Sequence, residues 1–307
     1  MSQQRRQGMD HDHYEWSPIA TRPKLVWQGG ARVALCAIVA LERVEWSPPP
    51  GSVQSPALYR HLALHRPVPE FWSVSHREYG HRVGIFRVLD VLEKHGIRPT
   101  IAMDAITARN YPYLVRHCLA RDCELIAHGI SASRMITSRM SEAEERAYIA
   151  ESVEALHLAT GVRPRGWAGP EYGESTRTPQ LLAEAGIRYV CDWANDEQPY
   201  RMRTAGEPLY ALPVMVELDD VFALRDRSFR VDEYAVQIKE AFDTMYRDAE
   251  AGARLLALNL HPWLIGQPFR IGFLDDALGH VMKHPGVWAA NGLAIIDAYR
   301  AARPEQA

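Results

Sequence analysis

Residues 32–41 carry the sequence RVALCAIVAL and residues 254–260 carry RLLALNL, which are the two most strand-like runs of the chain. Short, nearly uninterrupted apolar runs of this kind are typical of strands buried on both faces, as in parallel sheets. Each run is followed at once by a residue with acid–base chemistry, Glu42 after the first and His261 after the second. We therefore expect a buried sheet whose strand ends carry functional side chains.

Strand-like and helical patterns alternate along most of the remaining chain. Further strands are predicted at residues 99–103, 123–127, 162–167, 187–191 and 209–218, with a short one at 287–290. Helices are predicted at residues 80–95, 111–120 and 178–185, and from Ser141, where Glu144 completes a capping box. Another helix is predicted where Tyr234, Ile238, Phe242 and Met245 recur at helical spacing. This alternation predicts an α/β fold with a mostly parallel sheet, and the number of units favours a barrel.

The chain of 307 residues suits one large domain over residues 31–303, preceded by an N-terminal extension over residues 1–30. Residues 47–78 are rich in Pro and Ser and form a long predicted insertion after the first strand. Long loops of this kind often cover active sites. Two roles stay open for the insertion: to cover the site, or to pack against a neighbouring subunit.

Composition narrows the class of partner. The formal charge of −3 gives no electrostatic case for nucleic acid or an acidic membrane, so a small-molecule substrate is expected. The first residues lack the apolar run of a signal peptide, and no stretch has the length and composition of a membrane span. The four cysteines form no C-x-x-C pair, which favours reduced structural thiols and a cytoplasmic location.

Polar residues stand at the ends of five predicted strands, and in a barrel these ends converge on one rim. They are Glu42, His128, Asp192, the pair Asp219 and Asp220, and His261. Each also has a structural interpretation. Glu42 could be a rim carboxylate paired with Arg43 or Arg82, His128 a turn residue, Asp192 a hydrogen-bond acceptor, and Asp219 with Asp220 a capping turn. His261 is the strongest candidate because Pro262 restricts its backbone to an extended conformation and so fixes where the imidazole points.

Five motifs in order resemble those of the polysaccharide deacetylase (NodB-homology) superfamily. They are Glu42 after the first strand, Glu124-Leu-Ile-Ala-His128-Gly129, Arg165-Gly-Trp167, Cys191-Asp192-Trp193 and Leu258-Asn-Leu-His261-Pro262. The stretches Glu78 to Gly84, Cys191 to Tyr200, Glu217 to Asp220 and His261 to Arg270 are similar to the allantoinase-type and cyclic-imide-hydrolase-type branch. The resemblance implies a distorted (β/α) barrel with about seven parallel strands, and hydrolysis of a non-peptide C–N bond in a small amide, cyclic imide or ureide. It also implies a homo-oligomer, for which the aromatic segment at residues 70–74 offers an interface.

The metal set of the sugar deacetylases is incomplete in this sequence. Those enzymes hold a divalent metal through an aspartate after the first strand and two histidines spaced i and i+4, and a second aspartate is the base. Here Glu42 is followed by Arg43, and Ala132 occupies the position four residues after His128. Catalytic zinc usually keeps three protein ligands, so we expect no cofactor. A divalent metal such as zinc stays possible on Glu42 and His128 if Glu171, Asp219 or the histidines of the Asp10-His11-Asp12-His13 string complete the set.

The expected mechanism uses Glu42 as general base, with its pKa raised by burial, and His261 as general acid for the leaving nitrogen. His128 and nearby backbone N–H groups are expected to stabilise the oxyanion. Substrate contacts are predicted from an aromatic wall and from polar residues, namely Trp167, Trp193, Tyr200, Trp263, Arg82, Arg270, Glu171, Asp192 and Asp219. The alternatives are a metal-dependent N-deacetylase of an acetylated sugar, and a degenerate barrel that binds a small ligand without turnover.

Overall fold

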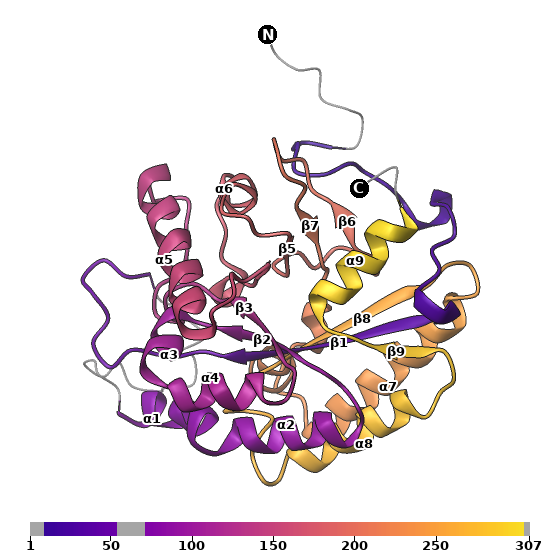
Figure 1. Cartoon of the computed structure of the whole chain (residues 1–307). Helices are drawn as coiled ribbons and strands as arrows, with labels where there is room; N and C mark the ends of the chain where they lie inside the picture. Colours follow the sequence, from indigo (N-terminus) through magenta and orange to yellow (C-terminus); the bar gives the residue numbers. More distant parts are fainter. Residues whose placement is uncertain (1–8, 54–70, 304–307) are drawn as a thin grey trace.

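The computed structural model describes residues 9–53 and 71–303, and its centre is a curled sheet (Figure 1). The strand order is β6-β7-β5-β4-β3-β2-β1-β8, and β9 also pairs with β1. All strand pairs are parallel except β6 with β7. The strands are β1 (Val33–Leu41), β2 (Thr100–Met103), β3 (Glu124–Ala127), β4 (Gly166–Trp167), β5 (Tyr189–Val190), β6 (Tyr200–Arg201), β7 (Tyr210–Ala211), β8 (Arg254–Leu260) and β9 (Val287–Ala289). The sheet is therefore a half-barrel, and the fold is the distorted NodB-like (β/α) barrel that the sequence predicts.

Helices cover the outside of the curl. Figure 1 shows α2, α4, α7 and α8 lined up below the sheet, with α5 to one side and α9 above it. The helices are α1 (Phe71–Tyr79), α2 (Ile85–Lys94), α3 (Ala105–Asn110), α4 (Pro112–Leu119), α5 (Glu142–Thr160), α6 (Thr178–Glu184), α7 (Val231–Asp248), α8 (Ile271–Met282) and α9 (Gly292–Ala302). The capping box of Ser141 and Glu144 begins α5, as predicted.

The central strand β1 is buried on both faces because each face meets its own apolar cluster. Val33, Leu35 and Val39 join the cluster that α2, α7 and α8 complete. Cys36 and Ile38 join a second cluster with residues of α9. Successive side chains of a strand point to opposite faces, so a run that is apolar at nearly every position suits this place. The strand holds Glu42 at its end in a rigid frame.

Some predicted elements are shorter in the structure. The strand expected over residues 209–218 pairs as β7 only at Tyr210–Ala211, and Val216–Leu218 form a 3-10 turn. Pro213 has no N–H to continue a ladder, which explains the early end. The helix expected over residues 80–95 begins with a π-helical turn, Gly80–Gly84, that continues directly from α1. The four cysteines are free and buried.

The described part of the N-terminal extension packs on the sheet rather than standing apart from it. Leu25 and Trp27 are buried, and the Trp27 indole donates a 2.7 Å hydrogen bond to the carbonyl of Arg254 at the start of β8. Of the predicted insertion, residues 54–70 lie outside the described residues, and residues 71–78 form most of α1. In the part of the chain that the structure describes, no helix combines the length and apolar character needed to cross a membrane.

A close backbone approach fixes the segment after His261. A Cβ atom placed on Gly84 would meet the carbonyl oxygen of Pro262 at 1.9 Å, so only glycine fits there. We expect Gly84→Ala to lower the free energy of unfolding by roughly 1–3 kcal/mol, the usual range for overpacking. Chemical denaturation measures this, with Gly272→Ala as the control because a Cβ there meets nothing within 4 Å. Equal stability of Gly84→Ala and the wild type would contradict the close approach.

Candidate active site

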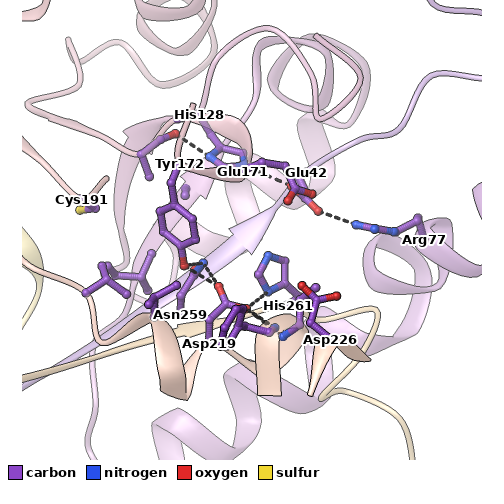
Figure 2. A pocket seen from close by; sticks show the side chains of 18 residues that line it. Glu42, Arg77, His128, Glu171, Tyr172, Cys191, Asp219, Asp226, Asn259 and His261 are labelled. Atoms are coloured by element: carbon purple, nitrogen blue, oxygen red, sulfur yellow. Dashed lines mark hydrogen bonds and ion pairs between the residues drawn. The ribbon is translucent and has the colours of Figure 1, made fainter. Parts of the chain in front are cut away.

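One pocket of about 130 Å³ lies where the main parallel strands end, and Figure 2 shows the side chains that line it. Glu42 follows β1, His128 follows β3 and His261 follows β8, so three strands deliver these side chains to one place. Glu171 and Asp219 line the same pocket. The apolar part of the lining comes from Ile38, Ala102, Ala168, Cys191, Val214, Val216, Val221 and Phe222. The pocket is small, which suits a small-molecule substrate.

Glu42 is the anionic centre of one half of the pocket. Nη1 of Arg77 donates to Oε1 of Glu42 over 3.0 Å, and Nε2 of His128 lies 3.3 Å from Oε2. Nδ1 of His128 lies 2.6 Å from the carbonyl oxygen of Ala168. A carbonyl oxygen only accepts hydrogen bonds, so Nδ1 carries a proton. Nε2 is therefore the atom of His128 that gains or loses a proton.

His261 is clamped by Asp220 in the other half. The backbone N–H of His261 donates to Oδ2 of Asp220 over 2.9 Å, and Nδ1 donates to Oδ1 over 2.6 Å. The carboxylate thus fixes the ring orientation and leaves Nε2 for the proton exchange, the arrangement that acid–base histidines use. Figure 2 shows the His261 ring directed toward Glu42 across the pocket.

Asp219 positions the floor of the pocket. Its Oδ2 accepts hydrogen bonds from Tyr172 and from Nδ2 of Asn259, and its Oδ1 accepts from the backbone N–H groups of Val221 and Phe222. With both oxygens engaged, Asp219 holds its neighbours in place rather than accepting a substrate proton. Tyr172 follows Glu171, and both have left-handed backbones, with φ of 56° and 54°. Strained turns of this kind persist where the surrounding structure fixes them, often at functional sites.

The charges in the pocket set the protonation states. Burial alone would raise the pKa of Glu42, but the hydrogen bond from His128 and the positive charges of His261 and Arg77 lower it to about 2. The pKa rise expected for Glu42 from the sequence is therefore wrong. Burial alone would lower the pKa of His261, but the carboxylates of Asp220 and Asp219 raise it to about 10. Against the effect of burial, Glu42 also raises the pKa of His128 above 6.5.

The predicted aromatic wall does not line the pocket. Trp263 is fully buried with the Arg77 guanidinium stacked on it, so it supports the site from beneath. Trp167 is fully buried in an apolar cluster with Leu182 and other core residues. Tyr200 lines a separate hollow beside the N-terminal extension. Trp167 at the end of β4 and Tyr200 at the start of β6 therefore do not reach the pocket, which the sequence alone does not reveal.

Other predicted contacts also lie elsewhere. Arg82 is exposed on the π-helical turn, and Arg270 contacts the carbonyl of Leu264 outside the pocket. Trp193 and Asp192 line a neighbouring hollow with Glu174. Oδ1 of Asp192 accepts a 2.7 Å hydrogen bond from the backbone N–H of Gly169, so this carboxylate shapes the turn before Glu171 and Tyr172. This contact fits the structural interpretation of Asp192.

Four polar residues that line the pocket are missing from the predicted set: Arg77, Tyr172, Asp226 and Asn259. The sequence could have indicated Asn259. It lies on β8 two positions before His261, so the two side chains face the same side of the sheet. Arg77 lies within the predicted insertion, where no strand end points to it. Only the fold brings α1 against the end of β1.

The residues around Glu42 do not fit the metal set that the resemblance implies. Ala132 is buried with Val44 and Val74, so no ligand stands at the i+4 position. The guanidinium of Arg77 already supplies a positive charge 3.0 Å from Glu42. Asp219, Asp220 and His261 also offer ligand atoms within 4.8 Å of one another. Nδ1 of His261 is used by Asp220, however, and the oxygens of Asp219 are used by four donors.

Comparison with known proteins gives the class of protein that combines this half-barrel with facing histidine–carboxylate pairs. Residues 78–190 match the polysaccharide deacetylase family. A Schizosaccharomyces pombe protein named as a polysaccharide deacetylase is 28% identical over 260 residues, covering 79% of this chain and 80% of that protein. The crystal structure of PuuE allantoinase is 26% identical with a TM-score of 0.80, covering 92% of this chain and 95% of that one. A Pseudomonas aeruginosa PAO1 structure named as a polysaccharide deacetylase is 25% identical with a TM-score of 0.80, covering 92% and 96%.

The chain carries a polysaccharide deacetylase (NodB-like) domain and is a hydrolase that acts on carbon–nitrogen bonds.

Proposed function

We propose that this hydrolase opens a small cyclic amide, imide or ureide without a metal ion. The observation that carries the proposal is the buried Arg77–Glu42–His128 set facing the His261–Asp220 pair across one small pocket. The guanidinium of Arg77 and the imidazolium of His261 provide positive charge and proton donors where a carbonyl oxygen would become negative. The likeness to an allantoinase, an enzyme of a cyclic ureide by its name, supports the choice of substrate class.

In this proposal the Glu42–His128 pair acts together as the general base. Glu42 has a pKa of about 2 and is a weak base by itself, so the pair with neutral His128 takes up the water proton, which then lies on Nε2 of His128 facing Oε2 of Glu42. Glu42 raises the pKa of that imidazole, and Arg77 holds the Glu42 carboxylate from its other side. Water then forms the new C–O bond at the carbonyl carbon. Arg77 stabilises the oxyanion through its second amino group, Nη2.

His261 supplies the proton for the leaving nitrogen. With a pKa of about 10 it is protonated at neutral pH, and its Nε2 proton transfers as the C–N bond breaks. The products are a carboxylic acid, which ionises, and an amine or amide still attached to it. Asp220 stabilises the imidazolium before the transfer and fixes its direction, as the aspartate of a catalytic triad does.

The pH dependence of turnover tests these protonation states. His128 must be neutral, so activity rises as pH increases through its pKa, which lies above 6.5. His261 must be protonated, so activity falls as pH passes about 10. We expect a bell-shaped profile of kcat/KM with these two limbs. A profile that falls with increasing pH between 6 and 8 would contradict the assignment.

A substrate panel tests the function itself. Hydantoin, dihydrouracil, succinimide, allantoin and N-acetylated sugar oligomers are incubated with the enzyme, and products are identified by mass spectrometry. We expect ring-opened acids, 18 Da heavier than a ring substrate because one water is added, and no release of acetate. Acetate from the sugars with no ring opening would favour the N-deacetylase alternative.

A further inference from the structure

Two arginines pack against one tryptophan beside the pocket, and a third arginine lies near them. The guanidinium carbons of Arg77 and Arg225 lie 4.1 and 5.2 Å from the centre of the Trp263 ring. Arg270 lies close enough for its positive charge to lower the pKa of Arg225. They come from α1, from the π-helical turn η7 (Phe222–Asp226) and from the segment before α8. The fold thus brings like charges together from three distant parts of the chain.

Within residues 9–53 and 71–303, few groups compensate these charges. Nη1 of Arg77 binds Glu42, but its Nη2 is buried and has no partner among the described residues. Arg225 makes no hydrogen bond and no ion pair with any described residue, and Asp226 is the acid that acts on it electrostatically. Arg270 donates a hydrogen bond to the carbonyl of Leu264. The negative charge of Asp220 acts to raise the pKa of Arg270.

Clustering of like charges carries an electrostatic cost, which lowers the pKa of neighbouring groups. Burial and the positive charges of Arg77 and Arg270 lower the pKa of Arg225. Burial and the same arginines, Arg225 first among them, lower the pKa of His76, whose ring also packs on Trp263. Partly buried positive charges are stabilised when an anion pairs with them. A planar guanidinium offers paired donors that match the two oxygens of a carboxylate.

We propose that Arg77 and Arg225, on either side of Trp263, form a carboxylate-binding subsite next to the catalytic pocket. The subsite joins the pocket directly, because Arg77 lines it and Phe222 and Asp226 of η7 line it too (Figure 2). The inference rests on the proposed function, since opening an amide ring always produces a carboxylate. Two sources supply this group: an acidic substituent of the substrate, or the carboxylate that the reaction creates.

Binding of succinate measured by calorimetry tests the subsite without turnover, with neutral succinamide as the matched probe. We expect succinate to bind the wild type and succinamide to bind at least about tenfold more weakly, as the loss of charge-assisted hydrogen bonds implies. Arg225→Gln should weaken the binding of succinate by about tenfold, and Arg225→Lys should weaken it by less. The control is Arg227→Gln, because Arg227 is exposed and pairs with Glu217. Equal binding of the two probes, or unchanged succinate binding in Arg225→Gln, would overturn the proposal.

Kinetics with two substrates identify the source of the carboxylate. If it belongs to the substrate, hydantoin-5-acetate has a lower KM than hydantoin, and Arg225→Gln removes the difference. If it is the newly formed group, the KM values agree, and Arg225→Gln weakens inhibition by the ring-opened product. Succinate binding without turnover of either ring would refute the proposed function and leave the subsite standing. Ring opening by an enzyme that binds succinate no better than succinamide would refute the subsite and leave the proposed function standing.

Discussion

Replacing His261 by alanine is expected to lower kcat by about 10²-fold or more, the usual contribution of a positioned general acid. The imidazole is the group of the pocket that is protonated at neutral pH and directed by a buried carboxylate. KM should change much less, because the lost proton transfer occurs in the transition state. Steady-state kinetics on any ring substrate that the enzyme opens provides the measurement.

Two companion variants separate chemistry from structure. Asp220→Asn keeps the size of the side chain but removes the charge that holds His261 protonated, so the alkaline limb of the pH profile should move to lower pH. His95→Ala is the control, since His95 also pairs with an aspartate, Asp275, but at a half-buried position outside the pocket. Turnover of His261→Ala equal to that of His95→Ala would reject His261 as the general acid.

Replacing Glu42 by glutamine is expected to lower kcat by about 10²-fold or more with the fold intact. The change removes the charge that raises the pKa of His128 and orients Arg77. The amide is also less able to compensate the buried guanidinium, so stability should fall as well, by at most roughly 3–5 kcal/mol. Kinetics and thermal denaturation are measured on the same preparation.

Glu45→Gln is the matched control for this variant. Glu45 lies three residues further on and pairs with Arg134 at a half-buried position outside the pocket. It should change stability without changing kcat. If Glu42→Gln behaves in the same way, losing stability while keeping its turnover, then Glu42 is a structural ion-pair partner and the base lies elsewhere.

The sequence predicts the frame of this site well because its signals are local. The apolar runs of β1 and β8 are nearly continuous, and Glu42 and His261 follow them directly, so their convergence follows from parallel strands. His128 follows from the same argument at the end of β3. The sequence does not tell which of the adjacent acids Asp219 and Asp220 pairs with His261. The fold is needed to show that Asp220 binds the ring and Asp219 holds Tyr172 and Asn259.

The sequence fails where a role depends on distant chain segments. Arg77 and Arg82 are both arginines of the same helical stretch, yet Arg77 is buried against Glu42 and Arg82 faces solvent. Trp263 follows His261 by two residues and was expected to contact substrate, but the turn after Pro262 buries its ring beneath Arg77. The pKa of Glu42 likewise depends on three positive neighbours, and burial alone predicts the wrong direction. The homo-oligomer and the cytoplasmic location stay predictions.

Turnover of the metal-depleted enzyme shows whether the reaction needs a metal ion. The purified protein is dialysed against a strong chelator, its metal content is measured by mass spectrometry, and opening of the ring substrate is then followed. The account predicts unchanged kcat with far less than one metal per chain, because Arg77, His128 and His261 supply the charge and protons. Activity that disappears with the metal and returns on adding zinc at one equivalent per chain would contradict it.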